Sequence, residues 1–300
     1  MSRVIVVGAG VIGLTCAVRL LERGHRVNVV ARDLPLETTS AIAGAFWYPY
    51  RALPQDRVTA WAGASYAEFV GLAGEPETGV SMVTGTEVFT NRQRDPWWRE
   101  AVPSLDRETS LPAGYVDGWT FTTPVIEMPV HLRWLSRRVD ELGGTITRLN
   151  LSALPTGADL VVDCAGLGAR HLAGDRSVTP VAGQVVVVEQ FGLDRWWLDA
   201  AGPTYVVPRA HDVVVGGTDA EGEWNRSPSP KTAADILERA ARLVPGVDRA
   251  RVLRHKVGLR PVRPAVRVER IGDVIHCYGH GGAGVTLSWG TADEVAALAG

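Results

Sequence analysis

The first thirty positions alternate between apolar runs and glycines in the pattern of a β-α-β unit. Residues 4–7 are an unbroken apolar run, which is typical of a strand buried in a parallel sheet. A glycine-rich turn follows over 8–13. Residues 14–23 then carry apolar side chains at helical spacing, and Gly24 is suited to the end of that helix. Because residues 26–30 form the next apolar run, the pattern predicts a strand, a helix and a second parallel strand.

Two later apolar runs also end in glycines, and we expect them in the same sheet layer. One covers 159–166, and the other covers 274–278 before the glycine cluster 279–284. A helix is predicted after that cluster, from about 286 to 298. Another helix is predicted over 126–144, because its apolar positions recur at helical spacing.

The segments between these strands have a different character. Residues from about 46 to 125 are rich in turn formers and tryptophan, and those from about 180 to 255 contain β-branched runs. We therefore predict an α/β fold in which a Rossmann-like nucleotide-binding domain, with a doubly wound parallel sheet, carries an inserted strand-rich α+β substrate domain. The nucleotide-binding domain is expected to comprise 1–45, 145–178 and 256–300, and the substrate domain 46–144 and 179–255.

Composition is that of an ordinary globular protein and excludes several classes of function. The 300 residues fit about two domains of ~150 residues, and a formal net charge of −2 offers no basic surface to nucleic acid. The longest apolar run, 4–18, contains three glycines and is shorter than the ~20 residues of a membrane span. The three cysteines are far apart in the sequence, in no metal-binding spacing. We expect a soluble, cytoplasmic protein with no metal ion, no nucleic-acid partner and no membrane contact.

The turn at 8–13 reads Gly-x-Gly-x-x-Gly, and each glycine has its own task. Gly8 permits the tight turn, Gly10 lets the backbone approach a pyrophosphate, and Gly13 allows helix and strand to pack closely. The helix N-terminus then offers amide hydrogens and a partial positive charge to the phosphates. Asp33 lies 20 positions past Gly13, where a ribose contact is expected, although its neighbour Arg32 is an equal candidate. The pattern predicts a dinucleotide site.

NAD and FAD share this fingerprint, and two features favour FAD. The fingerprint begins at residue 8, and the cluster 279–284 returns a glycine-rich backbone to the site late in the chain, as an isoalloxazine ring requires. A nicotinamide-dependent dehydrogenase is the alternative.

Residues 258–264, Gly-Leu-Arg-Pro-Val-Arg-Pro, hold two arginines between prolines. Proline fixes φ and removes a ladder donor, so Arg260 and Arg263 are expected on stiff backbone outside regular strand pairing. A rigidly held guanidinium suits bidentate binding of a carboxylate. Taken alone, the two arginines are more simply interpreted as solvated surface groups, and Tyr205 as a packing residue.

Together these segments resemble the FAD-dependent D-amino acid oxidase family. The resemblance implies that Arg260 and Tyr205 bind the substrate carboxylate, that the Gly282 carbonyl receives the α-amine, and that Tyr48 narrows the pocket. It rests on the run 4–14, Thr38-Thr39-Ser40, the run 43–50, Gly183-Gln184, the segments around Tyr205 and Arg260, the run 274–284 and Gly290-Thr291-Ala292.

The fingerprint and the resemblance together define the expected FAD contacts. They come from the glycine turn, the end of the second strand, the segment after it, the strand at 159–166 and the late glycine cluster. The residues are Gly8, Ala9, Gly10, Val11, Ile12, Gly13, Arg32, Asp33, Thr38, Thr39, Ser40, Gly44, Ala45, Cys164, Ala165, Gly166, Arg260, Gly281, Gly282, Gly284, Val285 and Thr286.

The activity that the resemblance implies is oxidative deamination of D-amino acids to 2-oxo acids, with release of ammonia and hydrogen peroxide. The partners would be a D-amino acid and O₂, no side chain would act as acid or base, and a homodimer is an option. Asp219 stands where relatives specific for D-aspartate tend to carry a basic side chain, so we expect neutral or basic D-amino acids. The alternatives are a related flavin amine oxidase acting on glycine or sarcosine, and an FAD-binding protein without turnover.

Overall fold

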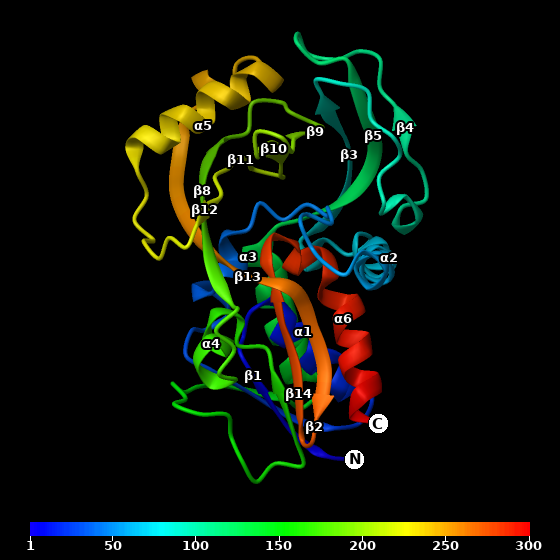
Figure 1. The fold of residues 1–300 in the computed structure, drawn as a ribbon, viewed down its shortest axis with the longest axis vertical. Coiled ribbons are helices and arrows are strands. Elements are labelled where there is room, and N and C mark those ends of the chain that lie inside the picture. Colours follow the sequence, from blue (N-terminus) through cyan, green and yellow to red (C-terminus); the bar gives the residue numbers. More distant parts are fainter.

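The computed structural model describes all 300 residues, which form two lobes joined by shared strands (Figure 1). One sheet runs through both lobes in the order β4-β5-β3-β9-β10-β11-β8-β13-β14-β7-β1-β2-β6, with β12 beside β8. Both chain termini lie in the lobe that contains β1, β2 and β14 (Figure 1). No helix of the chain combines the length and the apolar character that crossing a bilayer demands.

The lobe with the termini contains the predicted parallel layer, and the α/β fold class is confirmed. Adjacent strands pair in parallel, in the order β14-β7-β1-β2-β6. The side chains of β1, β2, β7 and β14 are largely buried, as their continuous apolar runs predict, whereas the edge strand β6 is mostly exposed. These strands are β1 (Arg3–Val7), β2 (Arg26–Ala31), β6 (Thr145–Arg148), β7 (Leu160–Asp163) and β14 (Val274–His280).

Six helices accompany the strands, and α1, α3 and α6 were predicted from the sequence. Helix α1 follows β1 directly, and Gly24, with φ +83°, ends it as expected. Helix α3 begins with a proline in its first turn, and α6 follows the late glycine cluster. The bounds are α1 (Val11–Glu22), α2 (Gln55–Leu72), α3 (Met128–Glu141), α5 (Pro230–Leu243) and α6 (Gly284–Ala299), and a single turn, α4 (Ala169–Leu172), follows β7.

Helix α2 was not predicted in the segment described from sequence as turn-rich. Its buried side chains include Val58, Trp61, Ala62 and Phe69, which recur at helical spacing. Glycines within the helix and the proline before it obscured that period. The helix packs against α6 so closely that a Cβ on Gly290 would overlap the Trp61 backbone. The boundaries of the two domains stay a prediction.

The other lobe is rich in strands, as its β-branched runs predict, and its strands pair antiparallel except for the parallel pair β3 and β9. Helix α5 covers one face of this sheet, where Ile236 and Ala240 share a core with Val186, Val206 and Val215. The strands are β3 (Val80–Phe89), β4 (Asp106–Arg107), β5 (Asp117–Ile126), β8 (Thr179–Glu189), β9 (Trp196–Asp199), β10 (Thr204–Pro208), β11 (Asp212–Gly216) and β12 (Ala220–Glu221).

Strand β13 (Val252–Ile271) corrects the expectation for Arg260, whereas Arg263 does lie outside regular strand pairing, as expected. The prolines do not take Arg260 out of strand pairing, because β13 pairs with β8 in register from Arg254 to Val262. The irregularity falls in the pairing with β14, where the register shifts between Val262 and Arg267. A proline removes one donor, so it disturbs one neighbour while the other ladder continues. The two long strands β8 and β13 thus connect the lobes (Figure 1).

Candidate functional site

A cavity of about 480 Å³ is lined by both lobes. Its walls come from the glycine turn after β1, the ends of β2 and β7, the segment 38–50, and parts of β8, β10, β13 and β14. Every residue that we predicted to bind cofactor or substrate lines this one cavity, with the exception of Gly13. Folding therefore brings together residues that are spread over almost the whole sequence.

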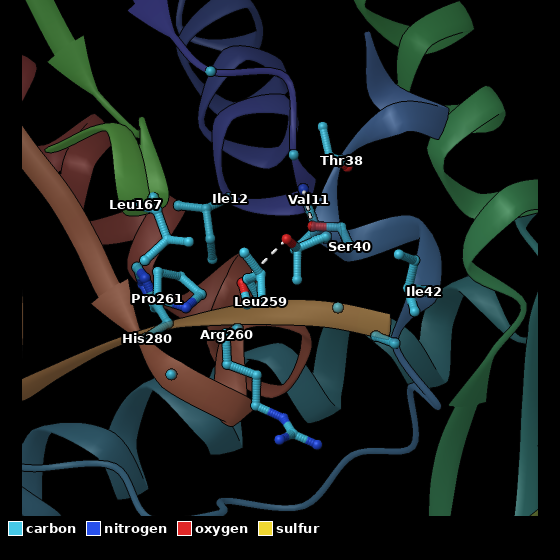
Figure 2. Close-up of a pocket in the computed structure, with 18 of the residues that line it drawn as sticks. Val11, Ile12, Thr38, Ser40, Ile42, Leu167, Leu259, Arg260, Pro261 and His280 are labelled. Atoms are coloured by element: carbon cyan, nitrogen blue, oxygen red, sulfur yellow. Dashed lines mark hydrogen bonds between the residues drawn. The ribbon is translucent and has the colours of Figure 1, made fainter. Parts of the chain in front are cut away.

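The glycine turn leaves no room for larger residues. Gly8 has φ +112°, and a Cβ on it would overlap the carbonyl oxygen of Cys164. A Cβ on Gly13 would overlap the carbonyl oxygen of Gly8, which explains why Gly13 lies behind the cavity wall rather than in it. The start of α1 has no capping bond from its own N-cap residue, and the Ser40 hydroxyl accepts the Val11 amide at 3.0 Å (Figure 2). The other amides of this helix N-terminus, beside the glycines, suit a pyrophosphate.

Arg32 and Asp33 lie together at the end of β2. The Arg32 Nη2 atom is 2.6 Å from an Asp33 carboxylate oxygen, and both residues line the cavity. The hydrogen bond from Arg32 holds the pKa of Asp33 below its usual range. The carboxylate is thus ionised and oriented, although the Arg32 side chain is mostly exposed.

Arg260 lies in the cavity wall on the side opposite the glycine turn. Its side chain extends from β13 away from Val11 and Ser40 (Figure 2). The Arg260 Nη1 atom donates to the Asp219 carboxylate at 2.7 Å and to the Thr218 carbonyl at 2.8 Å. Tyr50 donates its hydroxyl to the other oxygen of Asp219. The guanidinium is thus held by an internal carboxylate.

Glycines create the space around the Arg260 and Tyr205 side chains. A Cβ on Gly183 would lie 2.5 Å from the Arg260 guanidinium, and one on Gly44 would lie 2.7 Å from the Tyr205 ring. A Cβ on Gly282 would lie 3.5 Å from the Arg260 side chain. Burial raises the pKa of Tyr205, and the nearby Arg260 opposes that rise. The Tyr205 hydroxyl therefore stays protonated at neutral pH and can donate a hydrogen bond.

Tyr48 is fixed by a buried carboxyl group. Its hydroxyl lies 2.9 Å from both carboxyl oxygens of Glu87, a residue that is 1% exposed. Its backbone exchanges two 3.0 Å hydrogen bonds with the Thr286 hydroxyl. Burial raises the pKa of Glu87 to about 8, against the lowering effect of the Tyr48 hydroxyl. Tyr48 is therefore a rigid part of the cavity wall.

Sequence reasoning assigned no role to two of these residues. Tyr50 was part of a recognised segment, but nothing local indicated that it would meet a carboxylate 169 residues away. Glu87 is a single acidic residue in a strand, and its partner Tyr48 is 39 residues distant. Neither pairing has a signature in the sequence.

Comparison with known proteins gives consistent results over the whole chain. The family model for FAD dependent oxidoreductases, abbreviated DAO, matches residues 3–298. A D-amino-acid oxidase of Rubrobacter xylanophilus is 49% identical, with 100% of this chain and 96% of that protein covered. A D-amino-acid oxidase of Streptomyces coelicolor is 43% identical over 99% of this chain and 97% of that protein. The structure of a glycine oxidase from Geobacillus kaustophilus has a similar fold, with a TM-score of 0.85 at 20% identity over 99% of this chain and 95% of that one.

Proposed function

The chain belongs to the DAO family of FAD-dependent oxidoreductases, and from this premise we propose that it oxidises D-amino acids to 2-oxo acids, releasing ammonia and hydrogen peroxide. FAD is the cofactor. The observation that carries the proposal is the convergence of Arg260, Tyr205 and Gly282 in the cavity whose other side presents the glycine turn. The identity to relatives named D-amino-acid oxidase supports the same reaction.

The residues of the glycine turn fit FAD. Side-chain atoms at Gly8 or Gly13 would overlap neighbouring backbone, and Gly10 approaches Ser40 without a Cβ between them. The open N-terminus of α1 would face the pyrophosphate, and Asp33 or Arg32 would contact the ribose. Bound FAD would supply the acceptor for the two electrons of the oxidation, with O₂ as their final acceptor.

The chain itself binds and orients the substrate. The Arg260 guanidinium and the Tyr205 hydroxyl would both donate hydrogen bonds to the α-carboxylate, and these two bonds would fix the orientation of the carboxylate. The Gly282 carbonyl would accept from the α-amine and so hold a second Cα substituent. With the carboxylate and the amine fixed, the two enantiomers exchange the directions of the Cα–H bond and the side chain, so only one of them would direct its Cα–H at the hydride acceptor. Positioning of this kind lowers the entropic part of the barrier without a side-chain acid or base.

Asp219 would limit the substrate class. Its carboxylate already contacts Arg260 and has only 12% of its side chain exposed. A second carboxylate on the substrate side chain would be repelled by this negative charge, because the two groups would be close together and poorly solvated. We therefore propose neutral and basic D-amino acids as the substrates. We also propose a reduced, cytoplasmic setting, in keeping with three free cysteines, and a homodimer as the assembly to test by light scattering.

The test is peroxide formation by the purified protein with FAD. The substrates are D- and L-alanine, D-arginine, D-aspartate, glycine and sarcosine, and the controls are Arg260→Ala and the charge-conserving Arg260→Lys. We expect peroxide from D-alanine and D-arginine only, and a loss in Arg260→Ala that Arg260→Lys restores partially at most. Peroxide from glycine or sarcosine alone would favour the related amine oxidase. A yellow protein that is silent with every substrate would contradict the proposed roles of Arg260 and Tyr205.

A further inference from the structure

Three cysteines that are far apart in the sequence meet beneath the glycine turn. Cys16 lies in α1, Cys164 directly follows β7, and Cys277 lies in β14. Their three Sγ atoms all lie within 4.8 Å of one another. All three are buried and none forms a disulfide. Sequence spacing had suggested no metal site, and this cluster differs from that expectation.

The fold explains why these positions converge. Strands β7 and β14 are parallel neighbours in which His276 is paired with Asp163, so the next residues, Cys277 and Cys164, are also side by side. Side chains at equivalent positions of neighbouring strands point to the same face. Helix α1 brings Cys16 to that face, so the cluster joins three elements that carry the walls of the cofactor cavity.

The geometry is close to that of a metal–thiolate centre. Zn²⁺ binds thiolates at about 2.3 Å in a tetrahedral arrangement, so its sulfur ligands lie about 3.8 Å apart. The thiols need to approach by about 1 Å at most to reach that spacing.

The cluster itself supplies three ligands and no more. The ring nitrogens of His280, which ends β14, do not join the three sulfurs that lie within 4.8 Å of one another. Three thiolates leave the fourth position of a tetrahedral Zn²⁺ ion to a ligand from outside the chain, such as water.

We propose that Cys16, Cys164 and Cys277 form a binding site for one Zn²⁺ ion, which they hold through three thiolates. The site does not take part in the proposed oxidation. It connects α1, β7 and β14 under the glycine turn, and it therefore stabilises the framework of the cofactor cavity. Ligands must be deprotonated and the unfolded chain has no preformed site, so metal binding is coupled to folding.

The experiment measures metal content and stability of the FAD-loaded protein. Protein from zinc-supplemented cells is analysed by native mass spectrometry, and unfolding temperatures are recorded with and without a strong chelator. We expect one Zn²⁺ per chain, and a fall of roughly 5 °C or more when the chelator removes it. Added Cd²⁺ should occupy the same site and produce a thiolate-to-metal charge-transfer band.

Single variants separate metal binding from packing. Cys16→Ser and Cys277→Ala should lose the metal, the charge-transfer band and the chelator effect. Thr15→Val, a buried neighbour of Cys16 without a thiol, should lower stability but keep all three signals. The proposal is overturned if the wild-type protein carries no metal after zinc supplementation, if Cys16→Ser binds metal as the wild type does, or if the native protein contains a disulfide within the cluster.

Discussion

Because Asp219 contacts Arg260, we predict that the negative charge of Asp219 lowers the affinity of this guanidinium for a ligand carboxylate. Asp219 accepts from the Arg260 Nη1 atom at 2.7 Å, and both side chains are largely buried. A ligand carboxylate on the same guanidinium would lie about 5 Å from Asp219. Replacement by asparagine, Asp219→Asn, removes that charge while keeping an oxygen that can accept from Arg260.

The magnitude follows from the separation of the two carboxylates. Two like charges at about 5 Å and an effective dielectric constant of about 20 repel by roughly 3 kcal/mol. Solvent in the cavity reduces this figure, so we expect Asp219→Asn to bind a monocarboxylate about 10- to 100-fold more tightly. The ratio of D-aspartate to D-alanine turnover should rise in the same variant.

The assay is titration of the FAD-loaded protein with benzoate, a carboxylate without an α-amine, followed by the change in flavin absorbance. Asp175→Asn is the matched control, because Asp175 also accepts from an arginine, Arg263, and is also 12% exposed, but does not line the cavity. Its benzoate affinity should equal that of the wild type. Unchanged or weaker binding of benzoate by Asp219→Asn would refute the repulsion argument.

Three further predictions concern the cavity and its supports. Arg260→Ala should lower kcat/KM for D-alanine by a factor that corresponds to about 2–5 kcal/mol of activation free energy, while the purified protein keeps its flavin spectrum. Normal turnover would contradict the proposed binding of the substrate carboxylate by Arg260. Glu87→Gln should flatten the pH dependence of stability. The folded-state pKa of Glu87 is raised from 4.5 to about 8. Between these two pH values the free energy of unfolding of the wild type should therefore fall by about 1.4 kcal/mol per pH unit as pH rises. Chemical denaturation at several pH values measures this slope, and an equal slope in the wild type and Glu87→Gln would rule the prediction out. Gly290→Ala should lower the free energy of unfolding by about 1–3 kcal/mol, because its Cβ overlaps the Trp61 backbone, and an unchanged thermal midpoint would show that α2 and α6 can separate freely.

Local patterns determined the cofactor half of the site. The apolar run 4–7, the glycine turn and the helix after it were all predicted, because φ angles, strand burial and helix ends depend on residues close in sequence. The late strand and glycine cluster followed from the same pattern. Arg260 and Tyr205 were identified by residue type and by resemblance. Helix α2 was missed because glycines interrupted its apolar period, and the continuity of β13 was missed because prolines outweighed its strand pattern.

Tertiary structure alone decided which side chains meet. Arg260 and Asp219 are 41 positions apart, Tyr50 and Asp219 are 169 apart, and the three cysteines come from three elements. No local rule encodes such pairs, because each depends on the register of neighbouring strands and on how helices pack over them. The sequence by itself therefore determined the backbone that can hold a dinucleotide, whereas the packing of distant segments determined the charge beside Arg260, the anchoring of Tyr48 and the cysteine cluster.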